Sequence, residues 1–215
     1  EIASRFSSPM AFGTAGLPAI EGILKKQGQY LAARVALPMA DPARLPEIVD
    51  ALARNSPDIV FMVSPAKLAG DFLKVSRAKG LSAPLAMPSY GNADVLCAIA
   101  GKDSARGVIM AQVMPNVSNT AIPIVRRFQE DIKKHGEKDM RPNILQLEAY
   151  VTTQVLLEGL RRAGTAAPRQ KLVPALDALK RLDLGGYAVE FSPTRHTGSE
   201  FVDISIIGRD CKLMF

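Results

Sequence analysis

The sequence has little of several residue types on which common catalytic sites depend. It contains no tryptophan, two cysteines and two histidines among 215 residues. Acid–base and nucleophilic catalysis need polar side chains that converge, such as Ser with His and Asp or paired carboxylates. His135 follows two lysines at an expected helix end, where the helix dipole stabilises a cation, and His196 lies in a polar turn. We therefore expect no catalytic residues and no enzymatic activity.

Long apolar runs and nucleotide-binding motifs are also missing. No segment approaches the roughly 20 apolar residues of a membrane-spanning helix, and the first residues lack the basic start and apolar run of a secretory signal. Neither Gly-x-Gly-x-x-Gly nor Gly-x-x-x-x-Gly-Lys-Ser/Thr occurs. These absences give no support to dinucleotide or triphosphate sites, so no cofactor is expected. The glycines of residues 12–16 are better explained by a turn from a strand into a helix than by an anion site.

The two cysteines, Cys97 and Cys211, lie far apart in the chain. No second Cys or His stands at metal-ligand spacing from either one, so no metal site is expected. Cys97 lies in the apolar run 95–99, where a buried, unreactive thiol is the default. Cys211 lies in a turn and is expected to be more exposed. The sequence leaves a disulfide between them open.

The net charge of +6 raises the question of a nucleic-acid surface. Such a surface needs basic residues clustered on one face, with aromatic side chains that stack on bases. Here the basic residues occur as scattered pairs, such as Lys25-Lys26 and Arg126-Arg127, on the polar sides of expected helices. We expect solvated helix faces and no nucleic-acid partner.

The residues that are present predict an α/β fold. Hydrophobic residues make up 47% and charged residues 22%, as in ordinary globular proteins. The first half alternates apolar and amphipathic segments at short intervals, which is typical of βαβ units and a mainly parallel sheet. We expect strands at 30–37, 59–63, 84–87 and 108–113, with helices at 15–27, from 41 or 42 to about 52, 66–79 and 94–100.

The pattern changes after Met114-Pro115, which predicts a second packing region. Helices are expected at 122–134, 144–163 and 171–182, followed by strands at 187–191, 201–208 and 212–215. We expect residues 1–115 with 202–215 to form one α/β lobe, and residues 116–201 to belong to an incomplete, mainly helical one. Because these later helices have apolar faces and few strands to cover, we also expect an N-terminal segment with a second sheet to have been removed or lost.

Four segments, taken in order, resemble one known family. They are residues 11–17 (AFGTAGL), 107–115 (GVIMAQVMP), 147–164 (beginning LEAY) and 201–210 (FVDISIIGRD). In type I periplasmic solute-binding proteins of the leucine/isoleucine/valine-binding family, similar strings open the first helix of the second lobe, return the chain to the first lobe, form its long helix and close the second lobe. The segments span nearly the whole chain, so the set is more specific than any one string.

The resemblance implies a type I periplasmic-binding-protein fold with one parallel-sheet lobe plus part of a second lobe. In that family two α/β lobes close over a ligand held in the cleft between them. It also implies the solute-binding component of a bacterial ABC-type uptake system for amino acids or other small organic solutes. Such a protein carries an export signal, works in the periplasm and has a membrane permease as its partner. The alternative is a ligand-sensing domain of a receptor or transcriptional regulator with the same fold.

The family's ligand contacts come from loops that follow the strands of the second lobe. Carried over to this sequence, the predicted ligand-binding residues are Ser7, Ser8, Met10, Ser64, Pro65, Ser89 and Tyr90. Ser64 and Ser89 directly follow apolar strands, where the chain is expected to turn outward, whereas Tyr90 fits the cleft wall and the core equally well. Leucine-type members place a carboxylate against the ligand ammonium in the third loop, and this loop has none. An unpaired buried ammonium is costly, so an uncharged or carboxylate-bearing solute fits better.

Overall fold

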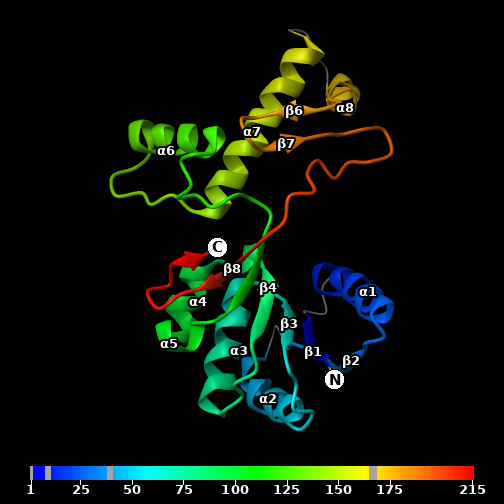
Figure 1. Ribbon diagram of the computed structural model, residues 1–215, viewed down its shortest axis with the longest axis vertical. Helices are drawn as coiled ribbons and strands as arrows, with labels where there is room; N and C mark the ends of the chain where they lie inside the picture. The colour runs from blue at the N-terminus through cyan, green and yellow to red at the C-terminus, as the bar shows by residue number, and fades with distance from the viewer. Residues whose placement is uncertain (1, 8–10, 38–40, 165–168) are drawn as a thin grey trace. The chain divides into compact units, whose positions relative to one another are not determined.

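The computed structural model describes residues 2–7, 11–37, 41–164 and 169–215, with the backbone alone for 2–7 and 11–15 (Figure 1). The chain divides into two compact units. Unit 1 comprises Glu1–Gln112 and Ile204–Phe215, and unit 2 comprises Val113–Asp203. Each unit is described by itself. Within the described residues, no helix is both long and apolar enough to cross a membrane.

Unit 1 is built on a seven-stranded sheet in the order β2-β1-β3-β4-β5-β8-β9. The strands are β1 (Ile2–Ser7), β2 (Leu31–Ala36), β3 (Val60–Val63), β4 (Leu85–Pro88), β5 (Ile109–Gln112), β8 (Asp203–Ile207) and β9 (Leu213–Met214). The pairs among β1 to β5 are parallel, whereas β8 and β9 form an antiparallel hairpin. The predicted α/β fold with a mainly parallel sheet is therefore confirmed.

The helices of unit 1 cover the two sides of this sheet unequally. They are α1 (Ala11–Lys26), α2 (Leu45–Ala53), α3 (Ala66–Ala78), α4 (Ala93–Ala100) and α5 (Lys102–Ala105), with short 3-10 turns η1 (Pro42–Arg44) and η2 (Ser89–Gly91). Figure 1 shows α3, α4 and α5 on one side of the strands and α1 on the other. The main core lies on the first side, where Leu52, Phe72 and Leu96 of α2 to α4 meet buried residues of the strands. Each such side chain stabilises the fold by about 1.5–3 kcal/mol through its burial.

Helix α1 begins earlier than the sequence indicates. We expected a turn over residues 12–16, but α1 starts at Ala11, so these residues form its first turns. The expected turn is therefore wrong. The alanines of this segment are the best helix formers, and they offset the cost of about 1 kcal/mol that a glycine adds within a helix.

Unit 2 is mainly helical. It contains α6 (Pro123–His135), α7 (Ile144–Ala163) and α8 (Arg169–Asp177), together with a two-stranded sheet of β6 (Leu182–Asp183) and β7 (Ala188–Val189). A capping box opens α7, because the Asn143 side chain accepts from the backbone N–H of Gln146 while the Gln146 side chain accepts from that of Asn143, both at 3.0 Å. The predicted helix at 171–182 is wrong at its end, because Leu182 instead pairs with Val189 in the small sheet.

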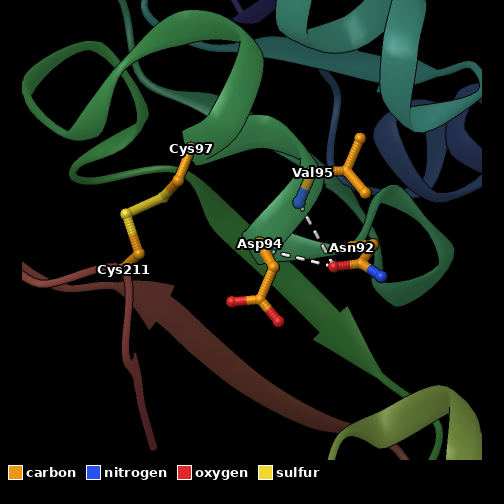
Figure 2. The surroundings of a disulfide bond; sticks show 5 residues. All are labelled: Asn92, Asp94, Val95, Cys97 and Cys211. Atoms are coloured by element: carbon orange, nitrogen blue, oxygen red, sulfur yellow. Dashed lines mark hydrogen bonds between the residues drawn. A yellow bond between two sulfur atoms is a disulfide. The ribbon is translucent and has the colours of Figure 1, made fainter.

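The two cysteines form a disulfide, so the expectation of an unreactive thiol at Cys97 is wrong (Figure 2). The hairpin of β8 and β9 carries Cys211 back to α4, where the two Cα atoms lie 6.2 Å apart. Cys211 adopts a left-handed backbone conformation (φ 62°) in the hairpin turn. Cys97 is half-buried at the side of α4, so the apolar run around it reflects the helix packing rather than a closed thiol site.

Candidate functional site

The parallel strands β1, β3 and β4 end on the same side of the unit 1 sheet. We call this side, where the carboxyl ends of the strands lie, the carboxyl edge. Ser7, the last residue of β1, pairs with Val63, the last residue of β3. Val60 of β3 pairs with Leu85 of β4, and the same offset places Ser64 level with Ser89. The backbone therefore gathers the loops after β1, β3 and β4 where ligands bind in open α/β sheets. Ser8 and Met10, also predicted for this site, lie outside the described residues.

The side chains of Ser64 and Ser89 are buried rather than turned outward. Their exposed fractions are 0% and 7%, and the Ser64 hydroxyl donates to the carbonyl of Pro65 at 3.3 Å. Pro65 itself is exposed. The predicted outward turn thus applies to Pro65 and not to the side chains of Ser64 and Ser89. Their role in ligand binding stays a prediction.

Tyr90 is the predicted site residue that lines a cavity. An apolar pocket of about 570 Å³ lies between α1 and the strands β3, β4, β5 and β8 of unit 1. Its walls include Ile20 of α1, Phe61 of β3 and Ile109 of β5, besides the half-buried Tyr90. Ser64, Pro65 and Ser89 are not among its lining residues. The edge loops and the pocket are therefore distinct features that share Tyr90.

Two of the helices that start at this edge, α3 and α4, differ in how their first amides are satisfied. At the start of α4, the Asn92 side chain accepts hydrogen bonds from the backbone N–H groups of Asp94 at 3.0 Å and Val95 at 3.4 Å (Figure 2). At the start of α3, Pro65 provides no side-chain cap. The first turn of α3 is therefore where free amides are available to an acceptor from solution. Asn92 was missed from the sequence, although Asn is a preferred N-cap residue.

A carboxylate also follows the third loop closely, although none lies within the loop itself. Asp94 lies on the first turn of α4, directly after the loop that contains Ser89 and Tyr90, and it is exposed (Figure 2). The first turn of α3 carries the opposite charge, because Lys67 forms an ion pair with Asp71 at 2.7 Å while remaining largely exposed. The first turns of α3 and α4 thus carry a cation, Lys67, and an anion, Asp94, respectively.

Metal-binding and histidine-based chemistry receive no support from the described part of the chain. No group of three or more His, Cys, Asp or Glu side chains there is placed to hold a metal ion. His135 ends α6, as expected, and is exposed. His196 lies in an exposed turn, with its Nε2 atom 3.3 Å from Oδ1 of Asp177. Both histidines belong to unit 2.

Comparison with known protein families finds a match to a family described as periplasmic binding protein, over residues 6–204. This chain belongs to the periplasmic binding protein family. The match includes all of unit 2 and most of the first segment of unit 1, and it confirms the resemblance that the four sequence segments carry. A comparison with curated proteins finds no match.

Solved structures of periplasmic binding proteins share this fold. A substrate-binding periplasmic protein from Ralstonia solanacearum is 28% identical, with a TM-score of 0.86 over 97% of this chain and 59% of its own. An extracellular ligand-binding receptor from Verminephrobacter eiseniae is 24% identical, with a TM-score of 0.87 over 99% of this chain and 60% of its own. A leucine-binding protein from Thermotoga maritima is 16% identical, with a TM-score of 0.84 over 99% of this chain and 59% of its own.

These likenesses confirm the type I periplasmic-binding-protein fold and its partial extent. The chain spans about 60% of the length of the solved structures that it matches. At the lower identities the likeness concerns the fold alone, so the leucine named for the Thermotoga protein belongs to that protein.

Proposed function

We propose that the full-length protein is the solute-binding component of an ABC-type uptake system in the bacterial periplasm. The observation that carries this proposal is the match to the periplasmic binding protein family over residues 6–204. Its partners would be a small organic solute and a membrane permease, and its role would be binding rather than catalysis. In the same proposal, residues 1–115 with 202–215 are the second lobe of such a protein, and residues 116–201 are part of its first lobe.

The disulfide supports an extracytoplasmic location. Cys97 and Cys211 are joined across the fold, and disulfides persist in the periplasm and other oxidising compartments while they are rare in the cytosol. This favours a periplasmic protein over a cytosolic transcriptional regulator with the same fold. A receptor ectodomain remains the second candidate, and a membrane-spanning segment fused to a signalling domain in the full-length chain would identify it.

The proposed ligand contacts lie at the carboxyl edge of the unit 1 sheet. They are the residues predicted from the sequence: Ser7, Ser8, Met10, Ser64, Pro65, Ser89 and Tyr90. The uncapped first turn of α3, which starts at Ala66, adds free amides beside these loops. Backbone amides at a helix start attract carboxylates through hydrogen bonds and the helix dipole.

The preferred solute in this proposal is uncharged or carries a carboxylate without an amine. Hydroxyl groups, α3 amides and the exposed Lys67 suit a carboxylate. An α-amino acid would need a partner for its ammonium, because a buried charge without one costs far more than a missing apolar contact. Asp94 is the carboxylate that follows the third loop most closely in the sequence, so the proposal requires that it does not bind the solute.

A thermal-shift screen of the full-length protein tests the ligand class. Organic acids and neutral solutes should raise the unfolding temperature more than leucine, isoleucine or valine, since a ligand at 100 times its Kd stabilises by about 2.7 kcal/mol. Native mass spectrometry of protein purified without denaturation would identify any solute that remains bound. The Asp94→Asn variant is the control, and its response to solutes should match that of the parent. A larger stabilisation by branched-chain amino acids, abolished in Asp94→Asn, would contradict the proposed solute class.

A further inference from the structure

Strand β9 lies beside β8 as the last strand in the order of the unit 1 sheet, and few contacts hold it there. It pairs with β8 at two positions, Met214 with Ile206 and Leu213 with Ile207. Leu213 packs against the main core, whereas Met214 is 56% exposed. A ladder of this length is short beside the five or six residues of an ordinary strand. The noncovalent contacts of β9 are therefore a weak attachment to the sheet.

The turn that precedes β9 has a cysteine where such turns favour glycine. Gly208 donates to the carbonyl of Lys212 at 2.8 Å, so residues 209–211 form the loop of the hairpin. Cys211, the last of them, has a φ of 62°. Three-residue hairpin loops usually place glycine at this left-handed position, because other residues are strained there. The disulfide to Cys97 of α4 holds the turn in this conformation and attaches it covalently to the core of unit 1 (Figure 2).

The backbone of β8 presents hydrogen-bonding groups to β9. The N–H of Ile207 donates to the carbonyl of Val108 at 2.9 Å, and the carbonyl of Ile207 accepts from the N–H of Gly107 at 2.8 Å. Both backbone groups of Ile207 thus face the side of β5. Successive residues of a strand direct these groups to opposite neighbours. The N–H and carbonyl of Ile206 therefore face β9, and they lose their partners in the sheet if β9 leaves.

The sequence of β8 suits pairing with a further strand. Residues 201–207 (FVDISII) are rich in β-branched residues, contain Asp203 as their one charged residue, and have neither proline nor glycine. Segments with this composition pair readily once their backbone edge is exposed. In a solution of one protein, the same strand of a second copy is the available partner, and a two-fold axis would bring the two strands together antiparallel.

We propose that β9 is a strap, held closed by the disulfide, that keeps β8 from pairing with β8 of a second copy. The link is necessary because the strap has two paired residues and a strained turn, and neither retains it on the sheet without the covalent attachment to α4. This explains why the turn carries Cys211 rather than glycine. The inference concerns self-association and does not depend on the proposed solute-binding function.

Hydrogen exchange of the full-length protein tests whether the link keeps the strap closed. In the parent, the N–H of Ile206 should exchange within about 10-fold of the rate of Ile207, because both are protected when the strap is closed. In dilute Cys97→Ser/Cys211→Ser protein, exchange at Ile206 should be at least about 10-fold faster than in the parent, since exchange follows local opening. An Ile206 N–H that exchanges freely in the parent, or equally in parent and variant, would overturn the proposal.

Sedimentation velocity tests the consequence for self-association. As its concentration rises, the serine variant should form a larger species than the parent does, and the N–H of Ile206 should regain protection as a strand of the second copy replaces β9. A serine variant that sediments like the parent would refute the proposed strap. Association that leaves Ile206 unprotected would refute it as well, because the contact would then lie elsewhere.

The matched control is Cys97→Ser/Cys211→Gly, compared below the unfolding temperatures of both variants. It lacks the same link, but glycine adopts the left-handed conformation at position 211 without strain. Its Ile206 exchange and its association should therefore lie closer to those of the parent than the serine variant's do. If the glycine and serine variants open and associate equally, the effect follows from the loss of overall stability and the strap proposal is wrong.

Discussion

A buried hydrogen bond joins β5, where the chain leaves unit 1, to the neighbouring strand β8, where the chain returns to it. The side-chain amide of Gln112, at the end of β5, donates to the Ser205 hydroxyl of β8 at 2.7 Å, and both side chains are fully buried. Ser205 in turn lies 3.5 Å from the carbonyl oxygen of Met110. A buried polar side chain that loses its partner keeps the full cost of leaving water. This pair is therefore expected to hold the returning strand β8 against β5.

The Ser205→Ala variant should lower the free energy of unfolding by about 1–3 kcal/mol, because it leaves the Gln112 amide buried without its acceptor. Chemical denaturation measures this change. The double variant Gln112→Leu with Ser205→Ala is the control, and it should recover most of the lost stability since both polar groups are then removed. A Ser205→Ala protein as stable as the parent would show that the hydrogen bond contributes nothing.

Among the helices, the last turns of α7 are held by a cluster of charges. Glu158 accepts hydrogen bonds from Arg161 at 2.8 Å and from Arg162 at 2.7 Å. These bonds lower the pKa of Glu158 from its ordinary value of 4.5 to about 2. Because the folded-state pKa is depressed, the stabilising contribution is present above about pH 4.5 and is lost as the pH falls toward 2.

The Glu158→Gln variant should therefore lose less stability than the parent protein when the pH is lowered from 5 to 2. Unfolding temperatures measured across this range provide the test, and the difference between the two proteins should shrink as the pH approaches 2. Glu190→Gln, which changes an exposed carboxylate of the same unit, is the control for the removal of one negative charge. If Glu158→Gln and Glu190→Gln behave alike, the arginines do not stabilise the end of α7.

The elements differ in how well local sequence predicts them. Helix α7 spans the predicted residues 144–163 because its signals are local: an Asn cap, apolar periodicity and a terminating Gly164 with φ 89°. Helix α8 stops at Asp177, before its predicted end, because Leu179 is buried and Leu182 pairs with Val189. Those partners are brought together by tertiary contacts, which override the helical pattern.

For the whole molecule, the disulfide closes a loop that contains all of unit 2. Its two cysteines are separated by 114 positions, and both lie in unit 1. Replacing both by serine should lower the free energy of unfolding by about 2–5 kcal/mol, mainly because the unfolded chain regains the freedom that the link removes. Denaturation with and without a reductant measures the effect. The double variant should be insensitive to the reductant, and a parent protein that is equally insensitive would show that the link adds no stability.

The placement of candidate residues at one end of the sheet could be predicted because strand order and loop position follow from the sequence pattern. Parallel strands end at one edge, so Ser7, Ser64 and Ser89 could be assigned to that edge from the order of elements alone. What side chains do there depends on neighbours distant in sequence. The burial of Ser64, the Asn92 cap on α4 and the entry of Tyr90 into an apolar pocket could not be predicted for that reason.

Local patterns thus determined the alternation of strands and helices and the family, because apolar periodicity, caps and short motifs are written in neighbouring residues. The tertiary structure alone decided the pairing of Cys97 with Cys211, the hydrogen bond from Gln112 to Ser205 and the contribution of Ile204 in β8 to the pocket beside α1. Each of these depends on the return of the chain from unit 2 to unit 1, which places β8 and β9 beside β5 and α4. Contacts between residues so far apart in the chain leave no periodic trace in the sequence.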